Sequence, residues 1–145
     1  MPEPSFNDQI ISEFRANAGV VGGPFEGASI VLMHTIGAKS GAPYVTPVVY
    51  RRDGDRLLVF ASAAGAPKHP AWFHNLVAHP EITVELREDG RIAKRTARAE
   101  NLEGEERDRL YARQAVDVPA FREYQEKTDR TIPVLALHVG DEVGA

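Results

Sequence analysis

The 145-residue sequence predicts an α+β fold: an antiparallel β-barrel of about six strands with an N-terminal helix and further peripheral helices. Three observations predict it. Runs rich in Ile, Val, Leu and Tyr recur along the chain, as is typical of strands. Turn signals at Asp53-Gly54-Asp55 and Asp89-Gly90 join successive runs as hairpins. Segments with helical spacing stand at the start of the chain and between the later runs.

The N-terminal segment is expected to form an amphipathic helix that begins after an N-cap at Ser5 and ends near Ala18. We expect this helix to pack on its own domain, since Glu13 and Arg15 do not make the cationic face of a membrane helix. A weak membrane contact or a contact with a partner is the alternative. The apolar residues share one helical face: Phe6, Ile10, Ile11 and Phe14.

The barrel is expected to follow a glycine-rich connection. A short helix should separate its third and fourth strands and end at the turn around His79-Pro80. The fourth strand shows a half-buried alternation of Ile82, Val84 and Leu86 with polar residues. The expected segments are strands over 29–35, 44–51 and 56–61, the helix over 70–78, and strands over 82–87 and 91–99.

Two helices and a last strand complete the expected order. Asn101 is a suitable cap for a helix reaching Gln114, and Pro119 is a favourable first residue for a helix ending at Lys127. The last strand should cover 132–139. One domain is expected, with residues 1–27 as helix and linker, 28–139 as barrel core and 140–145 as a frayed tail.

Composition excludes several classes of function. The net charge of −4 argues against general nucleic-acid binding, which needs a basic face. The absence of cysteine excludes disulfides and thiolate chemistry and is compatible with the cytosol. No apolar run approaches the ~20 residues of a membrane span, and no basic-then-apolar leader is present. We therefore expect a cytoplasmic protein, with membrane association as the alternative.

A glycine loop around Lys39 and Ser40 joins the first two expected strands. Gly37 and Gly41 flank these residues, so backbone amides can crowd together beside the lysine. Such a loop suits an anion such as phosphate, although a short glycine motif also fits a solvated hairpin turn. The spacing of a Walker loop is absent.

A second small-residue loop follows the third strand, over 61–69. It carries Lys68 and then opens the short helix through Pro70, Trp72 and Phe73. Two lysine-bearing loops that leave neighbouring strands can grip one elongated anionic ligand from both sides.

Other catalytic classes find little support. No nucleophilic triad can be assembled, because no serine occupies a Gly-x-Ser-x-Gly elbow. His69, His74 and His79 recur every five residues, which turns successive side chains about 140° apart on a helix. We therefore expect no metal site. Redox chemistry by a bound organic cofactor remains.

The two loops resemble the deazaflavin-dependent nitroreductase family, small actinobacterial proteins that use coenzyme F420. The likeness covers roughly residues 25–138. It implies a split β-barrel and an F420H2-dependent reductase that passes a hydride to a quinone-like or nitro-aromatic acceptor. The motifs that carry it are Gly37–Gly41 with Pro43, Thr46-Pro47, Ala61–Asn75, Asn75–Pro80 and Thr128–Pro133.

The resemblance also implies roles for single residues. Trp72 and Asn75 would support the second loop, although Trp72 equally suits a core anchor. Ser62 would orient the substrate or deliver a proton, although a serine here is also a common turn former. Thr46 belongs to the same set of cofactor-binding residues. The implied phosphate and tail ligands are Lys39, Ser40, Gly41 and Lys68, and the implied backing of the ring is Pro47, Val48, Ala61, Ser62, Ala63, Ala64 and Gly65.

The chain departs from the family pattern at two places. Members often carry arginines where this sequence has Ala38 and Tyr44, and two lost charge-assisted contacts of ~1.5–3 kcal/mol each would weaken cofactor binding. Tyr44 can stack or hydrogen-bond instead. Tyrosines of nitroimidazole-activating members correspond here to Val118, Phe121 and Tyr124, and this apolar set favours a flat hydrophobic acceptor such as a quinone.

Two other functions stay open. A flavin-mononucleotide oxidoreductase on the same fold would need more cationic support for its compact phosphate. A carrier or sensor that binds F420 without catalysis needs no different residues, because hydride transfer requires no catalytic side chain. Turnover with an acceptor separates the last alternative from an enzyme.

Overall fold

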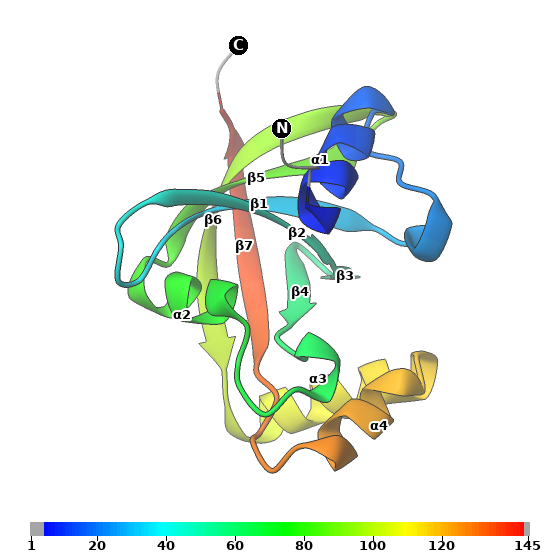
Figure 1. Cartoon of the computed structure of the whole chain (residues 1–145), viewed down its shortest axis with the longest axis vertical. Coiled ribbons are helices and arrows are strands. Elements are labelled where there is room, and N and C mark those ends of the chain that lie inside the picture. The colour runs from blue at the N-terminus through cyan, green and yellow to red at the C-terminus, as the bar shows by residue number, and fades with distance from the viewer. Residues whose placement is uncertain (1–4, 144–145) are drawn as a thin grey trace.

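The computed structural model describes residues 5–143. Seven antiparallel strands form one sheet that curls into a half-barrel, with helices at both of its ends (Figure 1). The strand order is β2-β1-β5-β6-β7-β4-β3. The strands are β1 (Ile30–Ile36), β2 (Pro43–Val49), β3 (Arg51–Asp53), β4 (Arg56–Phe60), β5 (Glu81–Glu88), β6 (Arg91–Leu102) and β7 (Val134–Glu142).

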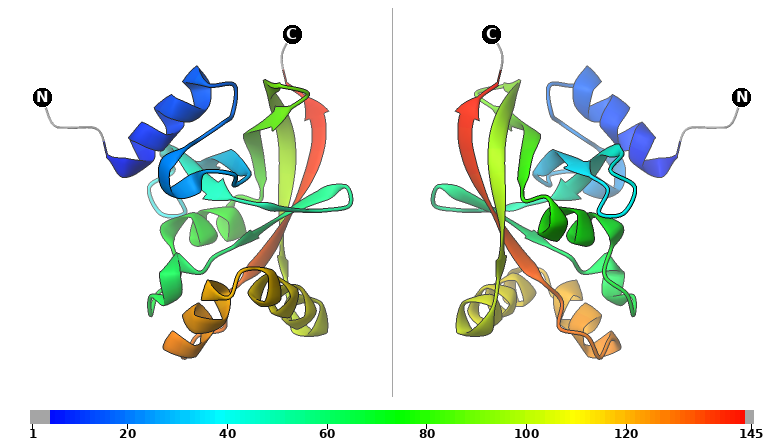
Figure 2. Two further views of the ribbon diagram at one scale, coloured as in Figure 1. Left: turned by 90° about the vertical axis from the view of Figure 1, so that its right-hand side faces the viewer. Right: turned by 90° about the vertical axis from the view of Figure 1, so that its left-hand side faces the viewer.

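Four α-helices accompany the sheet in the described part of the chain. α1 lies over one end of the half-barrel, and α3 with α4 lies at the other end (Figure 2). The predicted α+β fold with an antiparallel barrel and peripheral helices is confirmed. The helices are α1 (Phe6–Ala16), α2 (Ala71–Ala78), α3 (Gly104–Asp117) and α4 (Ala120–Lys127), with 3₁₀ turns at Gly23–Phe25 and Ala63–Gly65.

The core follows from the alternation of side chains along the strands. One face of the sheet buries residues such as Val31, Met33 and Val84 together with Phe73 and Leu76 of α2. The other face is covered by helices. Ile10 and Phe14 of α1 pack with Ile30 and Leu32 of β1, as the amphipathic N-terminal pattern predicts. α3 and α4 cover a third cluster: Leu58, Leu102, Leu110, Tyr111, Ile132, Val134 and Ala136, with Phe60, Phe121 and Tyr124 at its margin.

Two element ends that depend on local chemistry match the sequence closely. Ser5 caps α1, and its Oγ accepts a hydrogen bond from the Asp8 N–H at 3.1 Å. The helix ends at Ala16, two positions before the predicted end. α2 starts at Ala71, directly after Pro70, and runs to Ala78 as predicted.

Three expectations about where elements begin and end are wrong. The segment 44–51 is not one strand, because the chain leaves β2 at Tyr50 and continues as β3 at the opposite edge of the sheet. Asn101 does not cap a helix, because β6 continues to Leu102 by pairing with β7, and α3 begins only at Gly104. The tail is not frayed over 140–143: β7 reaches Glu142, and the Val143 N–H donates to the Lys94 carbonyl at 2.7 Å. Residues 144–145 lie outside the described residues.

None of the helices within residues 5–143 is both long and apolar enough to cross a membrane.

Candidate functional site

The first glycine loop is the turn of the β1–β2 hairpin, and its own hydrogen bonds fix its shape. The Gly37 N–H donates to the Ala42 carbonyl at 2.8 Å, and the Gly41 N–H donates to the Gly37 carbonyl at 3.0 Å. The Ala42 N–H donates to Ser40 Oγ at 3.1 Å. A Cβ on Gly37 would collide with that same oxygen, so a larger residue there would displace the Ser40 side chain from the turn.

These bonds leave the tip of the loop with unused donors. Among residues 5–143, no hydrogen bond occupies the amides of Lys39 and Ser40, which are neighbours at the exposed end of the turn. The Lys39 ammonium also has no ion pair or hydrogen bond within that range. Adjacent free amides beside a lysine attract a phosphate or carboxylate. The glycine pattern predicts several free amides at this point, and the structure leaves two, those of Lys39 and Ser40.

Asn75 of α2 fastens this loop to the rest of the site. Its side chain is only 8% exposed; Oδ1 accepts from the Ala38 N–H at 2.9 Å, and Nδ2 donates to Thr35 Oγ1 at 3.4 Å. We expected Asn75 to support the second loop, but its hydrogen bonds run to the first loop and to β1. The difference arises because α2 turns this face toward the hairpin.

A hollow of about 780 Å³ opens between the first loop and α2. Trp72, half-buried, lines it while also packing against the main core, as expected of a core anchor. The N-terminal end of α1 closes one side, a contribution that sequence reasoning missed. The lining residues are Ser5, Asn7, Asp8, Gly37, Ala38, Lys39, Ser40, Tyr44, Val45, Thr46, Ala71, Trp72, His74 and Asn75.

Several expected cofactor residues do not line this hollow. Lys68 is exposed and has no partner within the described range, so it remains available to a ligand approaching along the second loop. The hollow joins that loop only through the start of α2. The residues outside its lining are Gly41, Pro47, Val48, Ala61, Ser62, Ala63, Ala64, Gly65 and Lys68.

The second loop has an unusual backbone. Ala63 and Ala64 have φ of 45° and 53°, in the left-handed region that alanine rarely adopts. Gly65 follows with φ of 81°, and a Cβ there would stand 2.9 Å from the Tyr124 carbonyl oxygen. Strained backbone of this kind concentrates at ligand-binding segments, where the surrounding structure enforces it.

The three residues expected to face a substrate lie at the α3–α4 end of the molecule. Phe121 packs against Phe60 with ring centroids 5.5 Å apart, and Tyr124 packs against Phe121 at 5.3 Å. Val118 is exposed at the end of α3. None of the three lines the hollow beside Lys39, although the backbone of Tyr124 touches Gly65 of the second loop.

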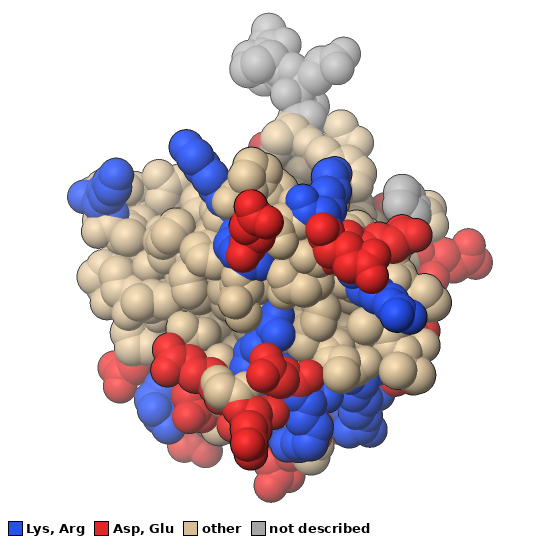
Figure 3. All heavy atoms as spheres, turned by 90° about the horizontal axis from the view of Figure 1, so that it is seen from below, with Lys and Arg blue, Asp and Glu red and all other residues tan. Residues whose placement is uncertain are grey.

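Charged side chains show no single-sign field on the side of α3 and α4. Acidic and basic groups intermingle over this end of the molecule (Figure 3). Within residues 5–143, no group of three or more histidine or acidic side chains is arranged to hold a metal ion. His69 instead contacts Arg130, with 2.9 Å between its Nδ1 and an Arg130 nitrogen.

Known proteins are similar to this one over most of its chain. Residues 9–138 fit the family described as F420H(2)-dependent quinone reductase. An F420H(2)-dependent quinone reductase of Mycobacterium tuberculosis is 36% identical over 132 residues, which is 86% of this chain and 83% of the relative. The solved structure of an F420-H2 dependent reductase, FDR-A, gives a TM-score of 0.61 at 38% identity, over 74% of this chain and 92% of its own.

A second solved structure, described as a domain-swapped dimer, gives a TM-score of 0.65 at 35% identity, over 89% of this chain and 92% of its own. The family match includes both loops and α2.

Proposed function

The chain belongs to the F420H(2)-dependent quinone reductase family, and on this premise we propose that the tip of the β1–β2 loop holds the phosphate of reduced coenzyme F420. The activity is hydride transfer from F420H2 to a quinone-type acceptor. The two lysine loops are assigned to the cofactor and the apolar surface of the second loop and α4 to the acceptor.

The observation that carries this assignment is the meeting of a free cation, two free amides and a hollow. Lys39 and the amides of Lys39 and Ser40 stand at its rim, and its volume of about 780 Å³ is in the usual range for cofactor and ligand sites. The residues present therefore fit an elongated anionic cofactor. The Tyr44 hydroxyl lies 3.4 Å from Ser40 Oγ and so reaches the tip of the loop, but it supplies no positive charge there.

The division of chemical work follows from the residues at hand. The bound deazaflavin supplies a hydride donor, and the protein supplies orientation and electrostatics. Lys39 and Lys68 neutralise the phosphate and acidic tail, and Trp72 limits water beside the hollow. Quinone reduction by hydride also consumes one proton. Ser62, half-buried on the second loop, is assigned to orient the acceptor or relay that proton.

The assignment is tested by fluorescence titration of the protein with F420 and, separately, with flavin mononucleotide. Lys39→Ala should weaken F420 binding about 10- to 150-fold, the effect of losing one charge-assisted contact of about 1.5–3 kcal/mol. Binding by the unaltered protein should weaken with added salt. Lys94→Ala, an exposed lysine on β6, is the matched control and should bind as the unaltered protein does.

Three results would contradict the proposal. Equal F420 affinities of Lys39→Ala and Lys94→Ala would show that the first loop does not bind the phosphate. A preference for flavin mononucleotide would identify the rival oxidoreductase. Tight F420H2 binding with no acceleration of its oxidation by any quinone would identify a carrier or sensor.

We propose in addition that α1 makes a weak membrane contact through which a lipid-soluble quinone reaches the site. Phe6 is 55% exposed at the end of α1 that borders the hollow. Sedimentation with lipid vesicles should carry down a small fraction of the protein, and Phe6→Ser should reduce it. Equal sedimentation of both proteins would refute the contact and leave a purely cytoplasmic reductase.

A further inference from the structure

Arg130 lies more than 60 positions after the second loop in sequence, yet its side chain contacts that loop from one end to the other. Nε donates to the Ala66 carbonyl at 2.9 Å, and the terminal nitrogens donate to the carbonyls of Ala61 and Ser62 at 3.1 and 2.7 Å. A further contact of 2.9 Å reaches His69 Nδ1. Four of the five N–H donors of this guanidinium are thus directed at one loop, so Arg130 is not itself free to bind a ligand anion.

The loop needs such support because its backbone is unfavourable. Ala63 and Ala64 adopt left-handed conformations, which cost free energy for residues with a Cβ. Within the loop, only two short bonds resist relaxation: the Gly65 N–H donates to Ser62, and the Ala66 N–H donates to Ala63. The guanidinium connects both ends of the loop from outside and therefore enforces the shape.

The contact with His69 also sets the state of that ring. An arginine only donates, so His69 Nδ1 must accept and the ring carries its proton on Nε2. Burial lowers the pKa of His69, and the charge of Arg130 and the neighbouring His74 lower it further. The ring is thereby held neutral at the end of the loop that leads into α2.

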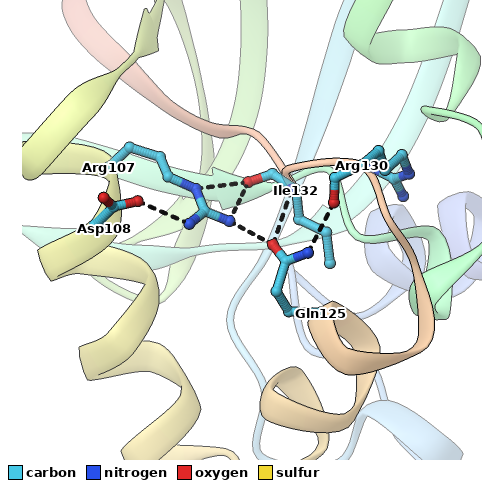
Figure 4. Close-up of polar contacts among 5 residues, drawn as sticks. All are labelled: Arg107, Asp108, Gln125, Arg130 and Ile132. Carbon is cyan, nitrogen blue, oxygen red and sulfur yellow. Dashed lines mark hydrogen bonds and ion pairs between the residues drawn. The ribbon is translucent and has the colours of Figure 1, made fainter.

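Arg130 is in turn held by the helices at the lower end of the molecule (Figure 4). Gln125 of α4 donates to the Arg130 carbonyl at 2.7 Å and accepts from the Ile132 N–H at 3.0 Å. Arg107 of α3 donates to that same Gln125 oxygen at 2.7 Å and to the Ile132 carbonyl at 2.8 Å. The segment 130–132 is therefore fixed by both helices, and the guanidinium projects from a rigid base.

We propose that Arg130 is a positioning residue that holds the second loop in the shape required for F420 binding, with His69 as its acceptor at the far end. This inference rests on the proposed function. It assigns Arg130 no contact with the cofactor; the residue acts through the carbonyls of Ala61, Ser62 and Ala66.

The test uses Arg130→Ala and Arg130→Lys, with Arg113→Ala on the exposed face of α3 as the control. Hydrogen exchange of the cofactor-free protein should show faster exchange at the amides of Gly65 and Ala66 in both Arg130 variants. Exchange in β1 and β5 should be unchanged. Lysine should not restore the loop, because an ammonium presents its donors from one point rather than from a planar fork.

Affinity for F420 provides the second measurement. Both Arg130 variants should bind roughly tenfold more weakly or worse, because F420 binding must then also order the released loop. Added guanidinium ion at millimolar concentration should restore part of the affinity to Arg130→Ala and leave Arg113→Ala unaffected. A loss of affinity caused by general destabilisation of the fold would not be rescued in this way, because guanidinium ion does not stabilise folded proteins.

The outcomes separate the two proposals. Loop exchange and F420 affinity unchanged in both variants would overturn the positioning role, as would exchange that rises equally in β1 and β5. If the unaltered protein fails to bind F420, the proposed function is wrong, and faster loop exchange in the cofactor-free variants would then support only the holding of the loop.

Discussion

At the scale of single residues, the candidate site depends on buried polar side chains that each connect two segments of the chain. Asn75 joins α2 to the Ala38 amide and to Thr35, whose side chain is also buried. Such a residue is costly to remove, because a buried donor or acceptor that loses its partner also loses access to water.

Asn75→Ala should therefore destabilise the protein by about 1–3 kcal/mol and release the first loop from α2. Urea unfolding of the variant measures the loss, and F420 affinity should fall along with it. Asn17→Ala, at an exposed position just after α1, should change stability by no more than about 0.5 kcal/mol. Equal stability of the two variants would show that the Asn75 contacts contribute little.

At the scale of elements, the second loop and α4 are in direct backbone contact. Gly65 adopts a positive φ, and its missing side chain is what lets the Tyr124 carbonyl approach. Gly27 offers a matched position, because its φ of 80° is nearly the same and no atom lies within 4 Å of its would-be Cβ.

Gly65→Ala and Gly27→Ala should both lose about 1–2 kcal/mol from the left-handed conformation. Gly65→Ala should lose ~1–3 kcal/mol more, because its methyl group overpacks against α4. Chemical denaturation gives the free energy of unfolding of both variants, and the difference between them is the cost of overpacking against α4. If the two losses are the same, the approach of α4 to the loop is not tight in solution.

The elements also show what a sequence can and cannot predict. The Ser5 cap and the β5–β6 hairpin turn depend on a few neighbouring residues, and both were predictable. The end of β6 depends instead on pairing with residues of β7, which no local pattern around Asn101 contains. The chain leaves β2 at Tyr50 because the next residues pair with β4 at the other edge of the sheet, which is a property of the whole topology.

The same division holds for the candidate site. Its glycines and lysines form short motifs that the sequence displays, so both loops can be proposed from the sequence alone. The supports of those loops are non-local: Arg130 reaches back 69 positions to Ala61, and Asn75 reaches back 37 positions to Ala38. The Asn75 contacts differed from expectation for this reason, and the α1 residues beside the hollow were missed.

At the scale of the whole molecule, α1 is joined to the sheet by charge as well as by Ile10 and Phe14. Arg15 donates to Glu85 of β5 at 2.8 Å, and His34 of β1 lies 2.6 Å from the same carboxylate oxygen. Burial acts to raise the pKa of Glu85, but the hydrogen bonds and charges of Arg15 and His34 outweigh it and leave the pKa below its ordinary value.

A lowered pKa means that the folded state favours the ionised carboxylate. The contribution of Glu85 to the free energy of unfolding is therefore complete above the pKa that this carboxyl has in the unfolded chain. It is lost as the pH falls through the lower pKa of the folded state. Glu85→Gln should reduce stability at neutral pH and lessen the decline toward acid. Unfolding free energies across pH 3–7 measure this, with the exposed Glu26→Gln as control. If stability falls toward acid as steeply in Glu85→Gln as in the unaltered protein, the ionised Glu85 does not contribute to stability through Arg15 and His34.

The two edge strands of the sheet, β2 and β3, follow one another in the chain and carry their own protection against fibril growth. β2 contains Pro43 and Pro47, which have no N–H to offer an incoming strand, and β3 consists of only Arg51, Arg52 and Asp53. Neither edge can template a long hydrogen-bonded ladder with another molecule. An incoming strand would therefore find few N–H donors along β2 and only three residues to pair with along β3.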